Sequence, residues 1–153
     1  MLLQEPGTSK TKENNVSRYC IVKTVFTDKT ALVAALMETG KWSLDQIEVH
    51  ATPQSLVGWK DDERAEKAHI IIRKRHVGDM SNDLGFAKTE EETYQAIISE
   101  YDSTRYGAKW VGQLRQNYAF HKLKLDQEEM GRTVTRERCP ESGHQRVEIT
   151  GYR

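Results

Sequence analysis

The sequence of 153 residues is poor in cysteine and proline, and it contains no long hydrophobic run. Two cysteines, Cys20 and Cys139, are too few for a disulfide framework or an all-cysteine metal site. No apolar stretch approaches the roughly 18 residues that a membrane-spanning helix requires. The first residues lack the basic start and apolar core of a secretory signal. We therefore expect a cytoplasmic protein without a membrane span, and we expect no metal and no cofactor.

Net charge is also absent, because 23 Lys and Arg residues balance 23 Asp and Glu residues. Such a balance excludes a global electrostatic field that would attract nucleic acid or an anionic membrane, and it leaves room only for a local patch. Charged residues make up 30% of the chain, which is typical of a soluble protein. The length suits one domain with a real core.

The familiar catalytic motifs are missing: the sequence has no GxSxG, no P-loop, no GxGxxG and no HExxH. Cys20 and His121 would act as nucleophile and base only if the fold brought them together, and a strand position makes Cys20 a core thiol. The sequence thus nominates no catalytic residue. An enzyme or small-ligand binder ranks third among our hypotheses.

The pattern along the chain predicts an α+β fold in which a mainly antiparallel sheet packs on a long helix, followed by a C-terminal β-hairpin. We divide the chain into a flexible polar tail at 1–16 and a single domain at 17–153. Apolar alternation, capping residues and turn residues predict these further elements: a strand from Ser17 to Phe26, a helix from Asp28 to Gly40, strands at 46–51, 55–59, 68–76, 84–88 and 93–99, and a hairpin of 133–138 with 145–150. We expect Pro53 to interrupt the early strands and 60–67 to form a charged turn. Residues 89–98 also fit a short helix.

The long helix between Gly107 and Gly131 has apolar residues on two sides. Val111, Leu114, Tyr118 and Leu125 mark one face. The second face consists of Ala108, Gly112, Ala119, Leu123 and Met130. We therefore expect this helix to lie between two layers, with the small residues allowing one layer to approach closely.

Several short motifs carry a resemblance to a known family. Asp83-Leu84-Gly85-Phe86 is followed about thirty residues later by a helix that contains Gln116-Asn117-Tyr118-Ala119-Phe120, then by Gly131 and the hairpin. Ser17-Arg18-Tyr19 through Lys23-Thr24 supplies the first strand. In this order the motifs resemble the uncharacterised family of hypothetical chloroplast reading frame thirty-five, also called domain of unknown function twelve-fifty-seven. The resemblance implies an accessory role. If the protein belongs to a plastid, the resemblance implies the stroma as its compartment.

Two surfaces are candidates for binding. The helix places the aromatic residues Trp110 and Phe120 beside Asn117 and Lys124, and aromatics among charged residues are typical of a partner-binding hot spot. We expect Trp110 or Phe120 to be partly exposed. The leading hypothesis is a non-enzymatic accessory or adaptor protein that docks on a larger protein assembly, with its oligomeric state left open.

The alternative is an RNA- or DNA-binding module. Its candidate residues are the basic ones that end the Ile-rich strand or lie on the hairpin, namely Arg73, Lys74, Arg75, Arg136, Arg138 and Arg146. One contiguous basic face without acidic residues would favour this alternative.

Overall fold

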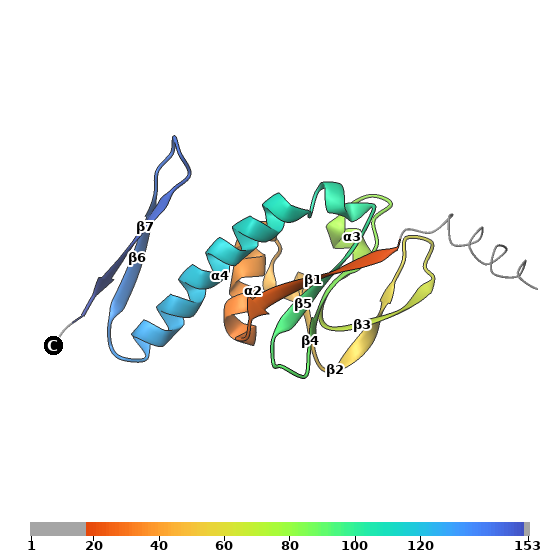
Figure 1. The fold of residues 1–153 in the computed structure, drawn as a ribbon, viewed down its shortest axis with the longest axis horizontal. Helices are drawn as coiled ribbons and strands as arrows, with labels where there is room; N and C mark the ends of the chain where they lie inside the picture. Colours follow the sequence, from red (N-terminus) through yellow and green to blue (C-terminus); the bar gives the residue numbers. More distant parts are fainter. Residues whose placement is uncertain (1–17, 152–153) are drawn as a thin grey trace, which may run out of the picture.

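The protein is built in three layers: a five-stranded antiparallel sheet, a pair of helices on one face of it, and a separate two-stranded hairpin on the far side of the helices (Figure 1). The computed structural model describes residues 18–151, and the predicted tail at 1–16 lies outside the described residues. The predicted α+β fold class is confirmed. None of the helices within residues 18–151 is both long and apolar enough to cross a membrane.

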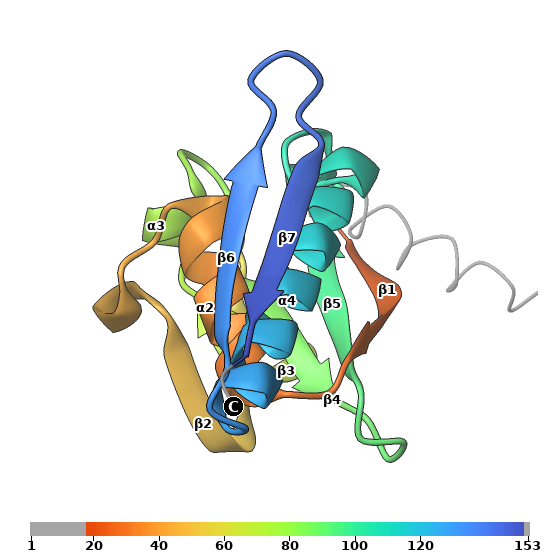
Figure 2. The same ribbon diagram turned by 90° about the vertical axis from the view of Figure 1, so that its left-hand side faces the viewer.

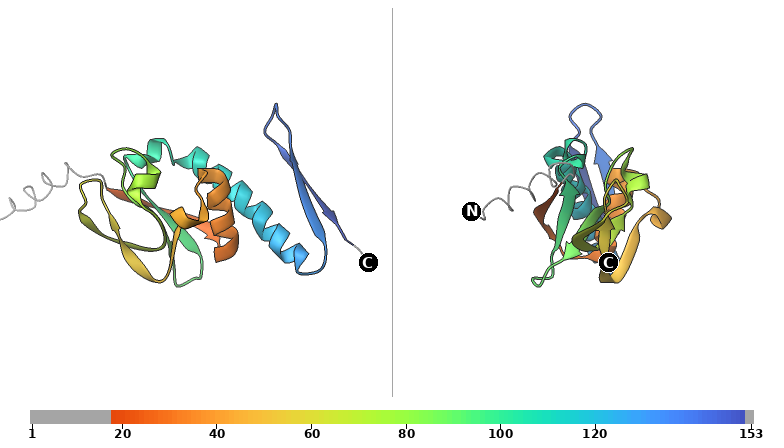
Figure 3. Two further views of the ribbon diagram at one scale, coloured as in Figure 1. Left: turned by 180° about the vertical axis from the view of Figure 1, so that it is seen from behind. Right: turned by 90° about the vertical axis from the view of Figure 1, so that its right-hand side faces the viewer.

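The sheet has the strand order β1-β5-β4-β3-β2, and every neighbouring pair is antiparallel. Its last four strands form a meander, while β1 is joined to β2 at the opposite edge by a helix that crosses the sheet (Figure 3). The strands are β1 (Tyr19–Phe26), β2 (Glu48–Val57), β3 (Glu63–Ile72), β4 (Leu84–Lys88) and β5 (Tyr94–Ser99). The hairpin consists of β6 (Thr133–Arg138) and β7 (Gln145–Thr150), with the predicted bounds.

Helices α2 (Lys29–Gly40) and α4 (Ala108–Glu128) cover one face of the sheet. The predicted cap is present, because the Asp28 carboxylate accepts a hydrogen bond from the Ala31 amide at 3.0 Å. Gly40 ends α2, although the left-handed residue is Lys41, with φ of 60°. A side chain at Gly40 would collide with the Trp42 ring, so this glycine is needed for packing. Gly131, with φ of +81°, follows the end of α4.

The main core lies between the sheet and these two helices. Phe26 of β1 packs against Tyr118 of α4 with ring centroids 4.6 Å apart, and Leu114 is fully buried. The Tyr118 hydroxyl accepts hydrogen bonds from the amides of Thr27 and Asp28, both at 3.0 Å. Burial of each large apolar side chain contributes about 1.5–3 kcal/mol, so the apolar face predicted for α4 is what attaches the helix to the sheet.

Three local predictions in the first half of the sheet are wrong. Pro53 does not interrupt a strand, because it lies within β2, an edge strand whose pairing shifts register between Val49 and Gln54. The expected charged turn at 60–67 is shorter, since β3 begins at Glu63. Arg73–His76 does not continue β3; residues Lys74–Val77 form the short helix α3.

The helical alternative for 89–98 is also wrong, because β4 and β5 form the predicted hairpin there.

A buried carboxylate joins the three chain segments that meet at one end of the sheet. Asp83, only 1% exposed, accepts hydrogen bonds from the amides of Val57 at 2.8 Å and Lys74 at 2.7 Å. The Arg73 guanidinium pairs with the same carboxylate at 2.7 Å. Asp83 therefore fixes the end of β2, the start of α3 and the start of β4 relative to one another.

The adjacent Asn82 extends this polar network to the segment that leads into α4. Its side-chain oxygen accepts from the Trp59 amide at 3.0 Å, and its amide nitrogen donates to Ser99 at 2.9 Å. The backbone nitrogen of Asn82 donates to Asp102 at 3.0 Å, within the short 3-10 helix η2 (Asp102–Thr104). All these side chains are satisfied, as buried polar groups must be.

We predict that Asp83→Asn destabilises the protein by about 1–3 kcal/mol, because the amide nitrogen that replaces one carboxylate oxygen cannot accept a hydrogen bond and leaves a buried donor unsatisfied. Urea unfolding followed by circular dichroism measures this change. Asp79→Ala is the matched control, since Asp79 is an exposed residue of the same connector, and it should change stability by less than about 0.5 kcal/mol. Equal unfolding midpoints for Asp83→Asn and the wild type would contradict the structural role given to Asp83.

Candidate functional site

The aromatic residues of the predicted partner-binding patch are buried, so the expectation that Trp110 or Phe120 is exposed is wrong. Their exposed fractions are 8% and 7%. Trp110 packs edge-on against Tyr106 and Trp42, with ring centroids 5.0 and 6.0 Å away. The helical wheel could not show this contact, because Trp42 comes from a distant segment. Trp110 is a core residue.

Phe120 and Asn117 hold the hairpin on the helices. The Arg136 guanidinium of β6 lies over the Phe120 ring, with its Cζ 3.9 Å from the ring centroid. The Asn117 side chain donates to Thr39 of α2 at 2.8 Å, and its oxygen accepts from Arg136 and Arg138 at 3.3 Å each. The hairpin therefore covers part of the polar arc of α4.

The small-residue face of α4 does not have the role we predicted for it. The helix does lie between two layers, but Ala108 and Ala119 are exposed and Met130 is 62% exposed. Figure 2 shows the hairpin in front of the two helices, and β6 is the hairpin strand that contacts α4 most extensively. The hairpin contacts α4 through arginine side chains at Asn117 and Phe120 and not through the small-residue face. Lys124 is only half-buried and pairs with Glu128 one turn later at 2.5 Å.

Glu38 of α2 completes this attachment, and the sequence analysis did not single it out. Its two carboxylate oxygens contact Arg136 Nη2 and His121 Nε2, each at 2.9 Å. Burial favours the neutral carboxyl, but the hydrogen bonds and charges of Arg136 and His121 outweigh burial and hold the pKa of Glu38 below its usual value. We call Glu38, Asn117, Phe120, His121 and Arg136 the hairpin clasp.

The basic residues nominated for nucleic-acid binding are divided between two regions. Arg73, Lys74 and Arg75 lie at or beside α3, whereas Arg136, Arg138 and Arg146 lie on the hairpin at the other end of the molecule (Figure 1). Most of them already have partners. Arg73 contacts Glu48 at 2.9 Å as well as Asp83, and Arg146 pairs with Glu137 at 3.1 Å.

The other two candidate basic residues near α3 are Lys74 and Arg75. Lys74 Nζ contacts Asp61 and donates to the carbonyls of Gly58 and Trp59. Arg75 is exposed and has no ion pair within residues 18–151. Acidic side chains thus accompany the basic ones in both regions, and the six residues do not form one contiguous face.

The surface hollows are polar and open. One, of about 510 Å³, lies beside α3 and is lined by equal numbers of acidic and basic side chains among Gln54, Ser55, Val57, Asp61, Glu63, Arg73, Lys74, Arg75 and Asp83. A second, of about 250 Å³, lies where Arg138 meets Glu38, Thr39, Lys41, Gln113, Gln116 and Asn117.

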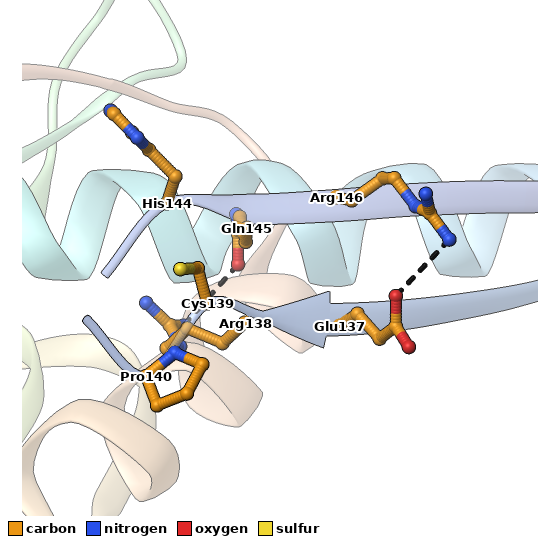
Figure 4. A pocket seen from close by; sticks show the side chains of 7 residues that line it. All are labelled: Glu137, Arg138, Cys139, Pro140, His144, Gln145 and Arg146. Atoms are coloured by element: carbon orange, nitrogen blue, oxygen red, sulfur yellow. Dashed lines mark hydrogen bonds and ion pairs between the residues drawn. The ribbon is translucent and has the colours of Figure 1, made fainter. Parts of the chain in front are cut away.

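A third hollow, of about 420 Å³, lies at the tip of the hairpin, where Cys139 and His144 flank the turn (Figure 4). Hydrogen bonds from the Ser142 hydroxyl and nearby backbone amides lower the pKa of the Cys139 thiol. Figure 4 shows the His144 ring directed away from the Cys139 sulfur, so the two groups do not converge. Across residues 18–151, no cluster of three or more His, Cys, Asp or Glu side chains could hold a metal ion.

Cys20 is exposed, which corrects the expectation of a core thiol. It lies on β1, which the sequence could not identify as an edge strand of the sheet. His121 belongs to the hairpin clasp, and the structure shows no contact between it and Cys20.

The free edge of β1 is a surface that the sequence analysis missed. Ile21 and Val25 are 56% and 67% exposed, although both lie in a strand whose other face packs on the helices through Val22 and Phe26. The sequence did contain a sign of this surface, because β-branched residues occupy both odd and even positions of the strand. It could not be interpreted without knowing that β1 has a neighbour on one side only.

These features define a small α+β protein with a clasped C-terminal hairpin. The chain belongs to the family described as "Protein of unknown function (DUF1257)", whose match covers residues 44–148, more than half of the chain. The matched range includes Asp83 with the strand β4 that follows it, α4 and most of the hairpin, while β1 and α2 precede it. Searches of curated proteins and of solved structures each found no match.

We predict that attachment of the hairpin weakens at acid pH through Glu38. Because the pKa of Glu38 is lowered in the folded protein, its contribution is complete above its ordinary value of 4.5 and is lost as the pH falls below that value. The protection factor of the β6 amides, which is the intrinsic exchange rate at each pH divided by the observed rate, should fall in this window.

Glu38→Gln is the matched variant, since the amide keeps the shape but not the charge. Its β6 amides should have lower protection factors than those of the wild type near neutral pH, with a smaller further decrease on acidification. Identical pH profiles for the two proteins would remove Glu38 from the clasp.

Proposed function

We propose that this protein is a non-enzymatic adaptor that docks on a larger protein assembly through the free edge of β1. The observation that carries the proposal is the exposure of Ile21 and Val25 on one face of an edge strand. Neighbouring Val22 and Phe26 point to the helices, so Ile21 and Val25 both point to the opposite face. Two exposed β-branched side chains on the same face of a strand could pack against apolar side chains of a partner strand.

The backbone of β1 supports the same mode of binding. The Glu100 amide donates to the Arg18 carbonyl at 2.7 Å, and the pairing of β1 with β5 keeps one register from Tyr19 to Val22. In this alternation Cys20 and Val22 direct their backbone groups to β5, whereas Tyr19 and Ile21 direct theirs to the open edge. The occupant we propose is an extended segment of a partner subunit that pairs with Tyr19–Val22.

The edge of β1 is limited in length, which suits a specific partner better than open-ended aggregation. The pairing of β1 with β5 becomes irregular between Val22 and Phe26, and Lys23 introduces a charge there. A partner strand would therefore find a short regular stretch followed by the exposed Val25 side chain.

The contacts of the basic residues count against the nucleic-acid alternative. Arg73, Arg136 and Arg146 each face a carboxylate within 3.1 Å, so phosphate would have to displace an existing pair. The exposed residues of β1 are Cys20, Ile21, Lys23 and Val25, and the single charge among them favours a protein partner over nucleic acid.

The test compares Ile21→Lys/Val25→Lys with the control Leu44→Lys/Met80→Lys, whose residues are similarly exposed, at 61% and 62%, elsewhere on the surface. Tagged full-length proteins are purified from the native host after nuclease treatment, at low and moderate salt. We predict that the β1 variant loses a stoichiometric protein partner by at least about tenfold, as expected for an interface hot spot, while the control retains it.

Direct binding of each variant to the purified partner then checks the interaction without the lysate, and urea unfolding checks that both variants remain folded. Equal recovery of every partner by the two variants contradicts docking at β1. Recovery that collapses with nuclease or with modest salt instead supports the nucleic-acid alternative.

A further inference from the structure

The sheet has a second, smaller core apart from the one beneath the helices. It consists of the buried residues Leu56, Ala68, Ile71 and Ile97. Gly85 lies within it, because a side chain at this position would collide with Ala68 and Leu56. Strands β2, β3, β4 and β5 each contribute to this core, and β1 is the next strand of the sheet.

Ile21 of β1 continues one row of this core to the edge of the sheet. It lies opposite Ile97 in the ladder of β1 with β5. Gly85 lies between Ile97 and Ile71, since it is opposite both. The row is buried in β3, β4 and β5, but it ends at Ile21, which is 56% exposed. An apolar side chain on a strand paired with β1 would extend the row and cover Ile21.

Lys23 is the next residue of β1 on the same face. Side chains alternate along a strand, so Lys23 projects to the same face as Ile21 and away from the helices. It is exposed, and within residues 18–151 it has no ion pair. Its ammonium group is therefore available to a carboxylate that comes from outside this chain.

Tyr19 is the preceding residue on this face, and its side chain is occupied by contacts within the chain. Its hydroxyl donates to the Asp83 carbonyl at 2.7 Å, and the Arg64 guanidinium Cζ lies 4.9 Å from its ring centroid. Ile21 and Lys23 are thus the side chains at this edge that discriminate between one partner segment and another.

We propose that the partner segment pairs antiparallel with β1, with an aliphatic side chain opposite Ile21 and a carboxylate opposite Lys23. Because the two strands run in opposite directions, the carboxylate comes two positions before the aliphatic side chain, and the segment has the pattern acidic-x-aliphatic. Every ladder of this sheet is antiparallel, and antiparallel pairs are slightly more stable than parallel ones. This inference rests on the proposed docking at β1.

The rival explanation is that Lys23 only protects the edge from aggregation. Charged residues, lysine above all, are a common device for this purpose on edge strands, and a charge of either sign provides it. Recognition of a carboxylate requires a positive charge. Reversing the charge at Lys23 therefore separates the two roles.

The test is a selection of random octapeptides displayed on phage against the full-length protein. The wild type, Lys23→Glu and the control Lys109→Glu are used in parallel. Lys109 is exposed on α4 and also has no ion pair within residues 18–151, so both variants change the net charge equally. We predict that the wild type and the control select acidic-x-aliphatic sequences, whereas Lys23→Glu selects basic-x-aliphatic sequences.

Synthetic copies of the peptides selected by the wild type then measure the size of the effect. We predict that they bind Lys23→Glu about three- to tenfold more weakly than the wild type at low salt, because a cross-strand attraction becomes a repulsion. The difference should shrink as salt is added, since an exposed charge pair is screened. Lys109→Glu should bind them like the wild type, and urea unfolding checks that the variants are folded.

The Ile21→Lys/Val25→Lys variant distinguishes failure of this inference from failure of the proposed function. Peptides that bind this variant as tightly as the wild type, or the absence of any selected peptide, contradict docking of an extended segment at β1 and overturn both proposals. Peptides that require Ile21 and Val25 but show no acidic preference overturn the acidic-x-aliphatic pattern alone. An acidic preference that persists with Lys23→Glu does the same.

Discussion

The buried carboxylate of Asp83 is the interaction on which the rest of the structure depends. Two other segments of the chain, at Val57 and at Arg73–Lys74, donate hydrogen bonds to it at 2.7–2.8 Å. A carboxylate that is 1% exposed is tolerated only because each oxygen is satisfied by a charge or a backbone amide. Through the neighbouring Asn82 and Asp102, the same network positions the chain just before α4, and α4 in turn carries the hairpin.

The hairpin is attached by a different kind of contact from the one that holds the main core. The sheet and the helices join through aliphatic and aromatic packing, whereas β6 contributes one buried aliphatic residue, Val134, and reaches the helices mainly through Arg136 and Arg138. An ionic clasp of this kind responds to pH and to substitution of one carboxylate. It also explains why a two-stranded sheet, which is marginal in isolation, is held in a defined position.

Two open strand edges have opposite chemical character. The β1 edge presents Ile21 and Val25, which suit an apolar partner, while the β7 edge presents the charged residues Arg146 and Glu148. Both edges offer backbone hydrogen-bonding groups, so the two edges differ mainly in their side chains. The family match includes most of the hairpin, and β1 precedes the matched residues.

The sequence by itself determined most, but not all, of the local elements of this protein. Alternation and turn residues predicted β6 and β7 with their observed bounds, and the 3.6-residue period predicted α4 and its sheet-facing side. Only the tertiary structure decided what covers the other sides of α4 and which strands are edges. Arg136 lies over Phe120 and pairs with Glu38, a residue 98 positions earlier, and Trp42 closes over Trp110. Local patterns reveal the period of an element, but burial depends on contacts between segments distant in the chain, which the periodicity of one segment does not encode.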